Sequence, residues 1–336
     1  MSMVHADRPR LRQELDRLVA DDRGPGVVAD VRDGDDPPWF GAAGVADLET
    51  GRPRGPGEHF RIGSFTKAFV GTVVLGLAAD GDLALDAPVT TWLPGVVEEY
   101  FPGADAARIT PRLLLNHTSG LPDAIPGQET PPAGEPGGRF VYSKVNYNLA
   151  GMIVEAASGS TLAEQIDRRV AAPLGLAGTY LPAAGEGLRD PHARHYSGQD
   201  ETGQETVRHD VTDADLSWAW AAGGMVSTTA DLHRFLAALL GGRLLPPAQQ
   251  EEMFTTVPTV PTEGAGWVPG ARYGLGVYSQ RFPSGVTLWG GGGYIQGSMT
   301  YAMGDRQGNH TLVANVNGDW GDFLATCADL FQAEFG

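Results

Sequence analysis

Residues 60–67 read Phe60-Arg61-Ile62-Gly63-Ser64-Phe65-Thr66-Lys67, and an apolar run over residues 68–79 follows directly. This run predicts a buried helix, because it is shorter than the ~20 residues that cross a bilayer. Ser64 and Lys67 stand at the head of that helix, where positions i and i+3 share a face, so the amine can reach the hydroxyl. The helix N-terminus favours an alkoxide and disfavours an ammonium. The segment therefore predicts a serine nucleophile with a neutral lysine as its base; the alternative is a capping serine beside a solvated lysine.

Lysine is rare in this chain. Of 24 basic residues only Lys67 and Lys144 are lysine, and all others are arginine. Because lysine can lose its proton when desolvated and arginine cannot, both lysines are candidates for chemistry. Tyr142 precedes Lys144 by two positions, and on an extended segment the two side chains point the same way. A phenol beside two cations is stabilised as a phenolate, or serves as a hydrogen-bonded relay to a leaving group; the alternative is a core tyrosine beside a surface lysine.

The composition is that of a globular protein with one large domain or two joined ones, 336 residues long with a net charge of −17. That charge disfavours a nucleic-acid partner, and the absence of a long apolar stretch predicts no membrane insertion. Residues 1–13 contain no apolar core, so we expect no signal peptide and a cytoplasmic location, or secretion if the sequence is truncated. The single Cys327 excludes an internal disulfide and is expected to be buried.

Helix and strand patterns alternate at both ends of the chain and enclose a mainly helical middle. This order predicts an α+β fold, an antiparallel β-sheet flanked by helices with an inserted all-helical domain. We expect a discontinuous sheet domain (1–78 and 237–336), a helical domain (79–236) and an active site in the cleft between them. The expected helices are 9–22, one from about 64, 111–115, 147–157, 231–240 and 322–335, and the expected strands are 26–31, 39–45, 273–278, 286–289, 298–303 and 311–316. A Pro/Gly-rich loop over 125–138 predicts a rim of the site, and Pro246-Pro247 predicts a linker.

Three further segments carry recognisable motifs: residues 113–121 (LLLNHTSGL), 142–151 (YSKVNYNLAG) and 217–227 (SWAWAAGGMVS). Together with residues 60–67 they resemble the serine β-lactamase/D-Ala-D-Ala carboxypeptidase superfamily, which includes class C β-lactamases and β-lactamase-like carboxylesterases. The resemblance covers nearly the whole chain from about residue 26. It implies the β-lactamase/transpeptidase-like fold and an active site without a cofactor.

The resemblance also implies roles for individual residues. Ser64 would be acylated, while Lys67 and Tyr142 would exchange the protons. The oxyanion donors would be the backbone N–H of Ser64 and of a residue near Tyr294, on the strand that includes Gly293. Such donors typically supply ~3 kcal/mol each.

The sequence departs from the family pattern at three places. Lys144 replaces a usual asparagine; at about 6 Å it would repel Lys67 by ~3 kcal/mol at an effective dielectric near 20, or it would bind a substrate carbonyl or carboxylate. The third motif, usually Lys-Thr-Gly or His-Thr-Gly, becomes residues 291–293 (Gly291, Gly292 and Gly293), or residues 289–291 with Trp289 first. A carboxylate-binding arginine is replaced by Tyr278. These losses argue against substrates with a free carboxylate and favour esters, amides or neutral acyl donors.

Trp218 and several histidines are further candidates for a role in or near the site. By family position Trp218 is expected to face the cleft and bind substrate, and His117 is expected to hold a loop. His192, His195 and the pair His209-Asp210 lie in a region that reads as loop, so we expect no metal site.

Several functions remain open at this level. The leading hypothesis is a serine hydrolase acting on an ester or amide, with D-amino-acyl and peptide-like molecules among the candidate acyl donors. Alternatives are an acyltransferase or cyclase of a biosynthetic pathway that uses the same acyl-enzyme, a D-alanyl-D-alanine carboxypeptidase, and a non-catalytic homologue that binds acyl ligands. The expected partner is a small-molecule or peptide-like acyl substrate, and the sequence does not indicate an oligomeric state.

Overall fold

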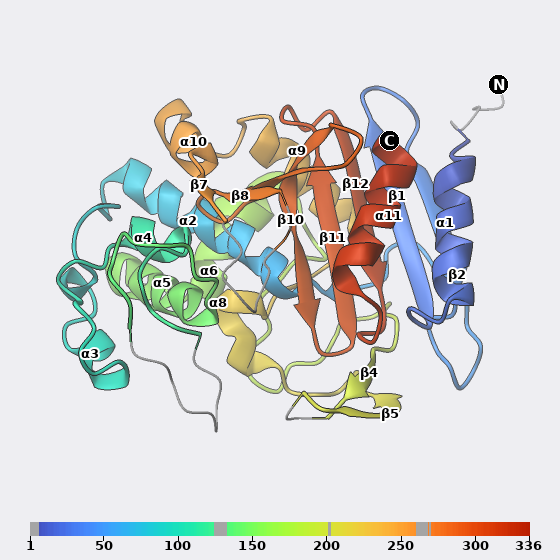
Figure 1. Ribbon diagram of the computed structural model, residues 1–336, viewed down its shortest axis with the longest axis horizontal. Coiled ribbons are helices and arrows are strands. Elements are labelled where there is room, and N and C mark those ends of the chain that lie inside the picture. The colour runs from blue at the N-terminus through green and yellow to red at the C-terminus, as the bar shows by residue number, and fades with distance from the viewer. Residues whose placement is uncertain (1–6, 124–132, 201–202, 260–267, 269) are drawn as a thin grey trace.

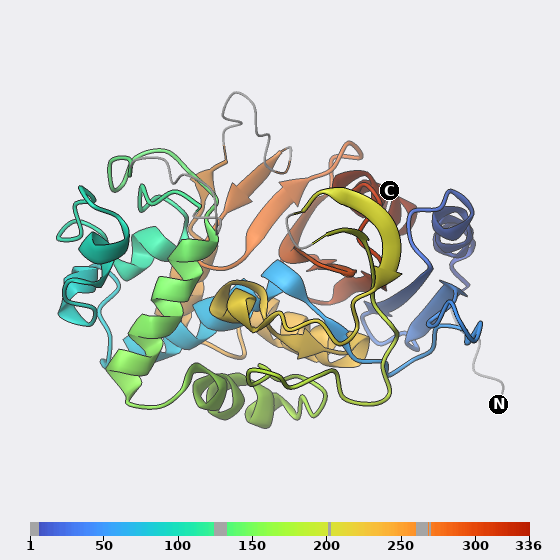
Figure 2. The same cartoon turned by 90° about the horizontal axis from the view of Figure 1, so that it is seen from below.

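The computed structural model describes residues 7–123, 133–200, 203–259, 268 and 270–336 (Figure 1). Most of the Pro/Gly-rich segment expected to form a rim, residues 125–132, lies outside the described residues. Two regions lie side by side, a large sheet with its covering helices and a mainly helical region, and α2 (Thr66–Asp80) runs between them in both views (Figures 1 and 2).

The sheet has eight strands in the order β2-β1-β12-β11-β10-β9-β8-β7, and neighbouring strands are antiparallel. β1 pairs with β12, so strands from the two ends of the chain lie side by side in one sheet. This arrangement confirms the predicted α+β class with an antiparallel sheet. The strand bounds are β1 Gly26–Asp33, β2 Trp39–Gly44, β7 Val257–Pro258, β8 Ala271–Tyr273, β9 Tyr278–Arg281, β10 Thr287–Ile295, β11 Ser298–Gly304 and β12 His310–Val316.

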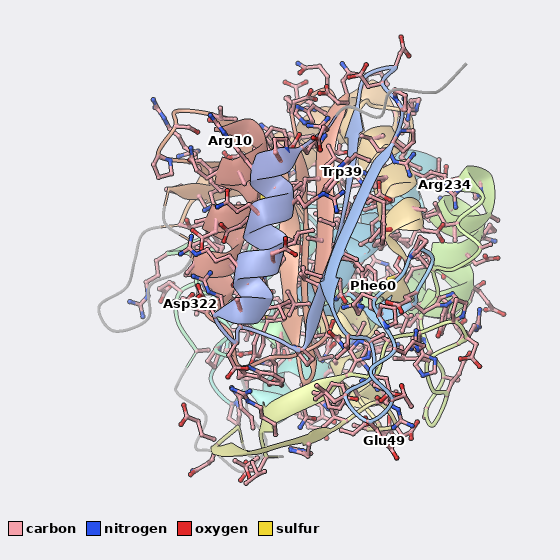
Figure 3. The ribbon with its side chains drawn as sticks, turned by 90° about the vertical axis from the view of Figure 1, so that its right-hand side faces the viewer. Arg10, Trp39, Glu49, Phe60, Arg234 and Asp322 are labelled. Carbon is pink, nitrogen blue, oxygen red and sulfur yellow. The ribbon has the colours of Figure 1, made fainter. Side chains whose placement is uncertain are left out.

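One face of the sheet is covered by the two terminal helices, α1 (Pro9–Ala20) and α11 (Phe323–Phe335), with α1 in front in Figure 3. Leu11, Leu15 and Leu18 recur at helical spacing and are fully buried against the sheet. The apolar stripe that predicted the first helix is therefore the surface by which α1 packs on the sheet.

The opposite face is covered by α9 (Thr229–Leu240), and the helical region packs beyond it. α2 is buried on nearly every side along its first three turns, because it lies between the sheet and the helical region. A polar side chain in the first turn of such a helix is removed from water. The remaining helices are α3 Val96–Tyr100, α4 Pro111–Leu115, α5 Lys144–Ser158, α6 Leu162–Ile166, α7 Ala172–Leu174, α8 Trp220–Gly223 and α10 Pro247–Phe254, with short turns η1 Gly63–Phe65, η2 Val89–Thr91, η3 Asp167–Ala171 and η4 Ser217–Ala219.

The structure differs from the sequence prediction at several elements. The strand expected over 273–278 is wrong: β8 ends at Tyr273 and β9 begins at Tyr278, and the turn between them includes Gly276 at φ +107°. The expected linker at Pro246-Pro247 is the start of α10, because a proline tolerates the first helical turn, where no intrahelical acceptor is available. The expected domain boundary at 236/237 falls inside α9; since this helix packs on the sheet, we assign all of it to the sheet region.

Two small antiparallel pairs lie outside the large sheet. β3 (Phe60–Arg61) pairs with β6 (Val226–Ser227), and β4 (Tyr196–Gln199) pairs with β5 (Glu205–Asp210). The first pair brings residues 60–67 against residues 217–227, two of the family motifs. In the described part of the chain, no helix combines the length and the apolar character needed to span a bilayer.

Candidate active site

Ser64 and Lys67 lie where the sheet meets the helical region. Gly63 opens the turn η1 with φ +50°, a conformation that favours glycine, and α2 begins at Thr66. Lys67 Nζ lies 3.1 Å from Ser64 Oγ and donates a hydrogen bond of 2.5 Å to the carbonyl oxygen of Ala222. The structure thus brings the predicted nucleophile and its predicted base within hydrogen-bond distance.

The side chain of Lys67 is 1% exposed. Burial disfavours the ammonium and lowers the pKa of Lys67 from 10.5 to about 7, while nearby Lys144 lowers it further and Asp123 opposes the shift. At neutral pH a large fraction of Lys67 is therefore an uncharged amine. Its lone pair is able to accept the proton of the Ser64 hydroxyl while an N–H group stays on Ala222.

Tyr142 is the third member of the cluster. Its side chain shares a hydrogen bond with Ser64, and Lys67 Nζ lies 4.9 Å from the centre of its ring. Burial raises the pKa of Tyr142 to about 12, against the opposing effects of Ser64 and Lys144. Of the two expected states of Tyr142, the phenolate is disfavoured, because desolvation outweighs the lowering effects of Ser64 and Lys144 on the pKa. Tyr142 is a neutral phenol, suited to the relay role.

Lys144 is the first residue of α5 and does not line the pocket beside Ser64. Its Nζ lies 2.5 Å from Asp123 Oδ2 in an ion pair, so its charge is largely compensated. Burial is the larger cause of the lowered pKa of Lys67, and the expected repulsion by Lys144 acts in the same direction.

The backbone of β10 lies directly against the turn η1. A Cβ atom on Gly293 would fall 1.8 Å from the carbonyl oxygen of Ile62 and 2.9 Å from Ser64 N, and one on Gly63 would fall 2.9 Å from Tyr294 N. Glycine at 63 and 293 is therefore required for this close approach. Because of this close approach, the backbone N atoms of Ser64 and Tyr294, the two expected oxyanion donors, lie on segments that contact each other.

A pocket of about 250 Å³ opens beside Ser64. Among the expected substrate-binding residues, Tyr278, Gly291 and Gly292 line this pocket, and Trp218 and Trp289 do not. Trp218 is 59% exposed, and the Trp289 ring packs on Phe254, with 5.2 Å between ring centres. The described lining consists of Ser64, Phe65, Tyr142, Val268, Tyr273, Gly276, Tyr278, Gly291, Gly292, Tyr294, Phe323 and Leu324.

Several functional residues had escaped the sequence reasoning. Asp123 stands two residues after the HTSGL motif, and an acidic residue there could have been matched to the unusual Lys144. The Ala222 carbonyl had no signal, because any residue type supplies a backbone oxygen. Phe323 and Leu324 were visible only as the start of a helix, and their position at the pocket depends on the order of strands in the sheet.

His117 holds the segment that carries Tyr142. Its Nδ1 accepts a hydrogen bond of 3.3 Å from the backbone N–H of Ser143, and its ring lies 4.5 Å from the Tyr142 ring. Burial, with Lys67 nearby, keeps the pKa of His117 well below its usual value, so the ring stays neutral. This geometry supports the predicted loop-holding role.

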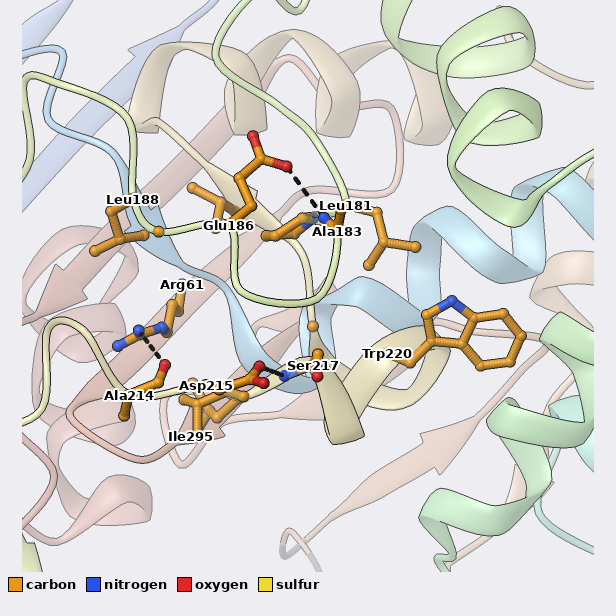
Figure 4. A pocket seen from close by; sticks show the side chains of 15 residues that line it. Arg61, Leu181, Ala183, Glu186, Leu188, Ala214, Asp215, Ser217, Trp220 and Ile295 are labelled. Atoms are coloured by element: carbon orange, nitrogen blue, oxygen red, sulfur yellow. Dashed lines mark hydrogen bonds between the residues drawn. The ribbon is translucent and has the colours of Figure 1, made fainter.

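The other histidines do not line the pocket beside Ser64, and a second hollow shares none of its lining residues. Within the described ranges no three His, Cys, Asp or Glu side chains gather as metal ligands would, and His209 and Asp210 lie on the strand β5 rather than in the expected loop. A smaller hollow, about 30 Å³, has Arg61 among its lining residues (Figure 4). The guanidinium of Arg61 donates to the carbonyl oxygens of Val211, Thr212 and Ala214, so it serves to hold that loop.

An antiparallel sheet joined to a helical region, with a serine and a buried lysine at the head of the helix between them, defines the β-lactamase/transpeptidase-like class of proteins. The family model described as Beta-lactamase matches residues 11–330, and the chain belongs to this family. The resemblance inferred from the motifs is thereby confirmed.

Known relatives include hydrolases of different substrates. Esterase EstB of Burkholderia gladioli is 34% identical over 196 residues, which are 50% of this chain and 50% of the esterase, so the chain matches only half of that relative's length. The crystal structure of a D-stereospecific amidohydrolase from Streptomyces sp. superposes with a TM-score of 0.85 at 36% identity, covering 98% of both chains. A D-amino acid amidase from Ochrobactrum anthropi SV3, complexed with L-phenylalanine amide, superposes with a TM-score of 0.82 at 28% identity, covering 97% of this chain and 98% of the amidase.

Proposed function

We propose that this protein is a serine hydrolase that forms an acyl-enzyme on Ser64 and cleaves esters or amides. One observation carries the proposal: the amine of Lys67, with a pKa of about 7, lies 3.1 Å from the Ser64 hydroxyl oxygen. A general base is most effective when its pKa is near the working pH, and this one is already within reach of the proton that it would remove.

In the acylation step Ser64 Oγ attacks the substrate carbonyl carbon while its proton passes to neutral Lys67. The negative charge that develops on the carbonyl oxygen would be met by the backbone N–H groups of Ser64 and Tyr294. The bond to the leaving group then breaks as Tyr142 donates its phenolic proton to the leaving atom. Lys67 returns the proton to Tyr142, so Lys67 and Tyr142 regain their starting protonation states while Ser64 carries the acyl group.

In the deacylation step a water molecule takes the place of the leaving group. Tyr142 would pass its phenolic proton to neutral Lys67 and accept the water proton as the water oxygen attacks the acyl carbon. The proton held by Lys67 would then return to Ser64 Oγ when the ester bond breaks. The products are a carboxylic acid and the free enzyme, and a single set of residues serves both steps.

D-Amino-acyl esters and amides are the first substrates to test. The names of two structural relatives, a D-stereospecific amidohydrolase and a D-amino acid amidase, support that class. The pocket agrees with a substrate that has no free carboxylate beside the scissile bond, because none of its described lining residues is charged. A carboxylate without a partner is costly to bury, which disfavours the carboxypeptidase alternative.

The test is intact-mass spectrometry of the protein after incubation with a fluorophosphonate and with a panel of D- and L-amino-acyl esters. We expect one adduct on the native protein and none on Ser64→Ala. Ser284→Ala, at an exposed serine in the β9–β10 turn, is the matched control and should label fully. Adding an amine to the ester reaction shows whether acyl transfer competes with hydrolysis. Absence of any adduct on the native protein would refute the proposal in favour of a non-catalytic acyl-binding protein.

A further inference from the structure

We propose that the pocket beside Ser64 is the leaving-group subsite, and that it takes a bulky, apolar, uncharged alcohol or amine. Phe323 and Leu324, in the first turn of α11, are its specificity-determining wall. This inference rests on the proposed function, because only a bond-breaking reaction has a leaving group.

The position of Tyr142 indicates which part of the substrate enters the pocket. Tyr142 shares a hydrogen bond with Ser64 and lines the pocket together with it. A residue that protonates the leaving atom has to stand within hydrogen-bond distance of that atom. The group attached to the leaving atom therefore lies on the Tyr142 side of Ser64, in the pocket, and the acyl group extends away from it.

α11 supplies this part of the pocket wall because Gly291 and Gly292 of β10 have no side chains to do so. A Cβ atom on Gly292 would fall 2.8 Å from Phe323 Cζ, and one on Gly291 would fall 3.1 Å from Phe65 Cδ2. Two aromatic rings thus occupy the space that side chains at 291 and 292 would fill. The family pattern implies a cation and a hydroxyl at the third motif on this strand. In this chain the aromatic rings of Phe323 and Phe65 lie there instead.

Phe323 is held firmly in this position. Its ring stacks on the Tyr301 ring, with 4.7 Å between centres and 26° between planes, and Tyr301 Oη donates a hydrogen bond of 3.1 Å to the Phe323 carbonyl oxygen. Asp322 caps the helix by accepting from the backbone N–H of Ala325 at 2.9 Å. Leu324 follows with 39% of its surface exposed, at the open side of the pocket. A fixed wall of this kind can discriminate shapes, since it does not yield to fit each ligand.

Size and charge define the class of leaving group. Apolar cavities of ~150 Å³ accept benzene, so a pocket of about 250 Å³ has room for a substituted ring or a branched alkyl chain. No described lining residue carries a charge to pair with a carboxylate. The pocket therefore favours an aryl, benzyl or branched alkyl group over a free amino acid such as D-alanine.

The experiment compares leaving groups at constant acyl group. D-Alanyl methyl ester, D-alanyl benzyl ester and D-alanyl-D-alanine are offered to the full chain, and kcat/KM is measured because it reports acylation even where deacylation limits kcat. We expect the benzyl ester to exceed the methyl ester by at least about tenfold, the scale of burying one ring, and the dipeptide to fall far below both. Equal values for methyl and benzyl esters, or a preference for the dipeptide, would overturn the inference.

Variants locate the effect in the wall. Phe323→Ala should lower kcat/KM for the benzyl ester by about tenfold and leave the methyl ester within about twofold. Phe323→Leu should give a kcat/KM for the benzyl ester between those of the native protein and Phe323→Ala. Leu48→Ala, at a remote exposed leucine, should leave kcat/KM unchanged for both esters. A melting curve for each variant separates unfolding from loss of selectivity. If Phe323→Ala alters selectivity among acyl groups instead, the pocket binds the acyl side and the inference is wrong.

Failure of the inference can be told apart from failure of the proposed function. Ester hydrolysis and fluorophosphonate labelling with no dependence on the leaving group would leave the serine mechanism standing and refute only the subsite. Absence of both hydrolysis and labelling would refute the two together.

Discussion

Lys144 and Asp123 form an ion pair close to Lys67, with 2.5 Å between Lys144 Nζ and Asp123 Oδ2. The other carboxylate oxygen, Oδ1, accepts a hydrogen bond of 2.7 Å from the backbone N–H of Lys144. The two residues act on Lys67 in opposite senses, since Lys144 lowers the pKa of the buried amine and Asp123 raises it. The carboxylate of Asp123 therefore limits the effect of Lys144 on the pKa of Lys67.

Removing one member of this pair should shift the pH dependence of catalysis in a direction set by the charge that remains. Asp123→Asn keeps the hydrogen-bond acceptor at the start of α5 but removes the negative charge, so the pKa of Lys67 falls and the acid limb of kcat/KM moves to lower pH. Lys144→Asn should move it to higher pH, and the double variant should lie between. Rate–pH profiles with a neutral ester measure all three, and shifts of equal sign in the two single variants would contradict this electrostatic account.

For the unmodified protein, kcat/KM should rise with pH through a midpoint near 7, because the active form is neutral Lys67 with a pKa of about 7. Lys67→Arg should lose about 10²–10⁴-fold in kcat/KM, since arginine keeps its proton at all accessible pH. Lys144→Arg is the matched control, because it changes the only other lysine and preserves the charge. A normal rate in Lys67→Arg would exclude the lysine as base.

Tyr142→Phe tests the proton relay. Because the phenol would protonate the leaving atom, its loss should cost about 10²–10⁴-fold for an alkyl amide, whose leaving group is basic. The loss should be much smaller for a nitrophenyl ester, whose leaving group departs without a proton. Tyr100→Phe, at a tyrosine 68% exposed and outside the pocket lining, serves as the control. Equal losses on the two substrates would assign Tyr142 a positioning role instead.

The Ser64–Lys67 contact could be predicted from the sequence because it is local. Two residues three positions apart in one helical turn are neighbours whatever the rest of the chain does. The α+β class was also predictable, since helix patterns such as that of Leu11, Leu15 and Leu18 stand beside strand patterns at both ends of the chain. Placing Tyr142 beside Ser64 required the family resemblance, because tertiary packing alone brings these segments together.

Part of the pocket wall could not be predicted, for two physical reasons. Side-chain alternation along β10 is lost in four consecutive glycines, one of which, Gly290, has φ +143°, so the direction of Trp289 could not be deduced. Phe323 reaches Gly292 only because the strand order of the sheet brings the end of the chain beside the strand β10. Both depend on contacts between residues distant in sequence.

Gly293→Ala should damage both stability and activity. Its Cβ would meet the Ile62 carbonyl oxygen at 1.8 Å, and because both contacting groups are backbone, β10 has to move away from η1. We expect a loss of about 1–3 kcal/mol in the free energy of unfolding from overpacking, and a fall of about 10²–10³-fold in kcat as the Tyr294 donor moves. Gly55→Ala, where a Cβ meets nothing within 4 Å, should leave both unchanged. Full activity in Gly293→Ala would remove Tyr294 from the oxyanion site.

Lys67 also makes the stability of the fold depend on pH, and here the sign is fixed by burial. Its pKa is about 7 in the folded protein and 10.5 in the unfolded chain, so between these values the unfolded chain binds the proton more tightly. Unfolding is therefore favoured at lower pH, and the lysine costs less stability as the pH rises from 7 toward 10.5.

Lys67→Met removes this cost, so its gain in the free energy of unfolding over the native protein should shrink by about 2 kcal/mol between pH 7 and pH 9. Denaturant titrations at the two pH values measure the gain, and Leu75→Met on the same helix, with no titratable group, should show a difference that does not change with pH. A gain for Lys67→Met that stays constant would mean that the amine remains charged in the folded protein, and the neutral-base mechanism would then fail with it.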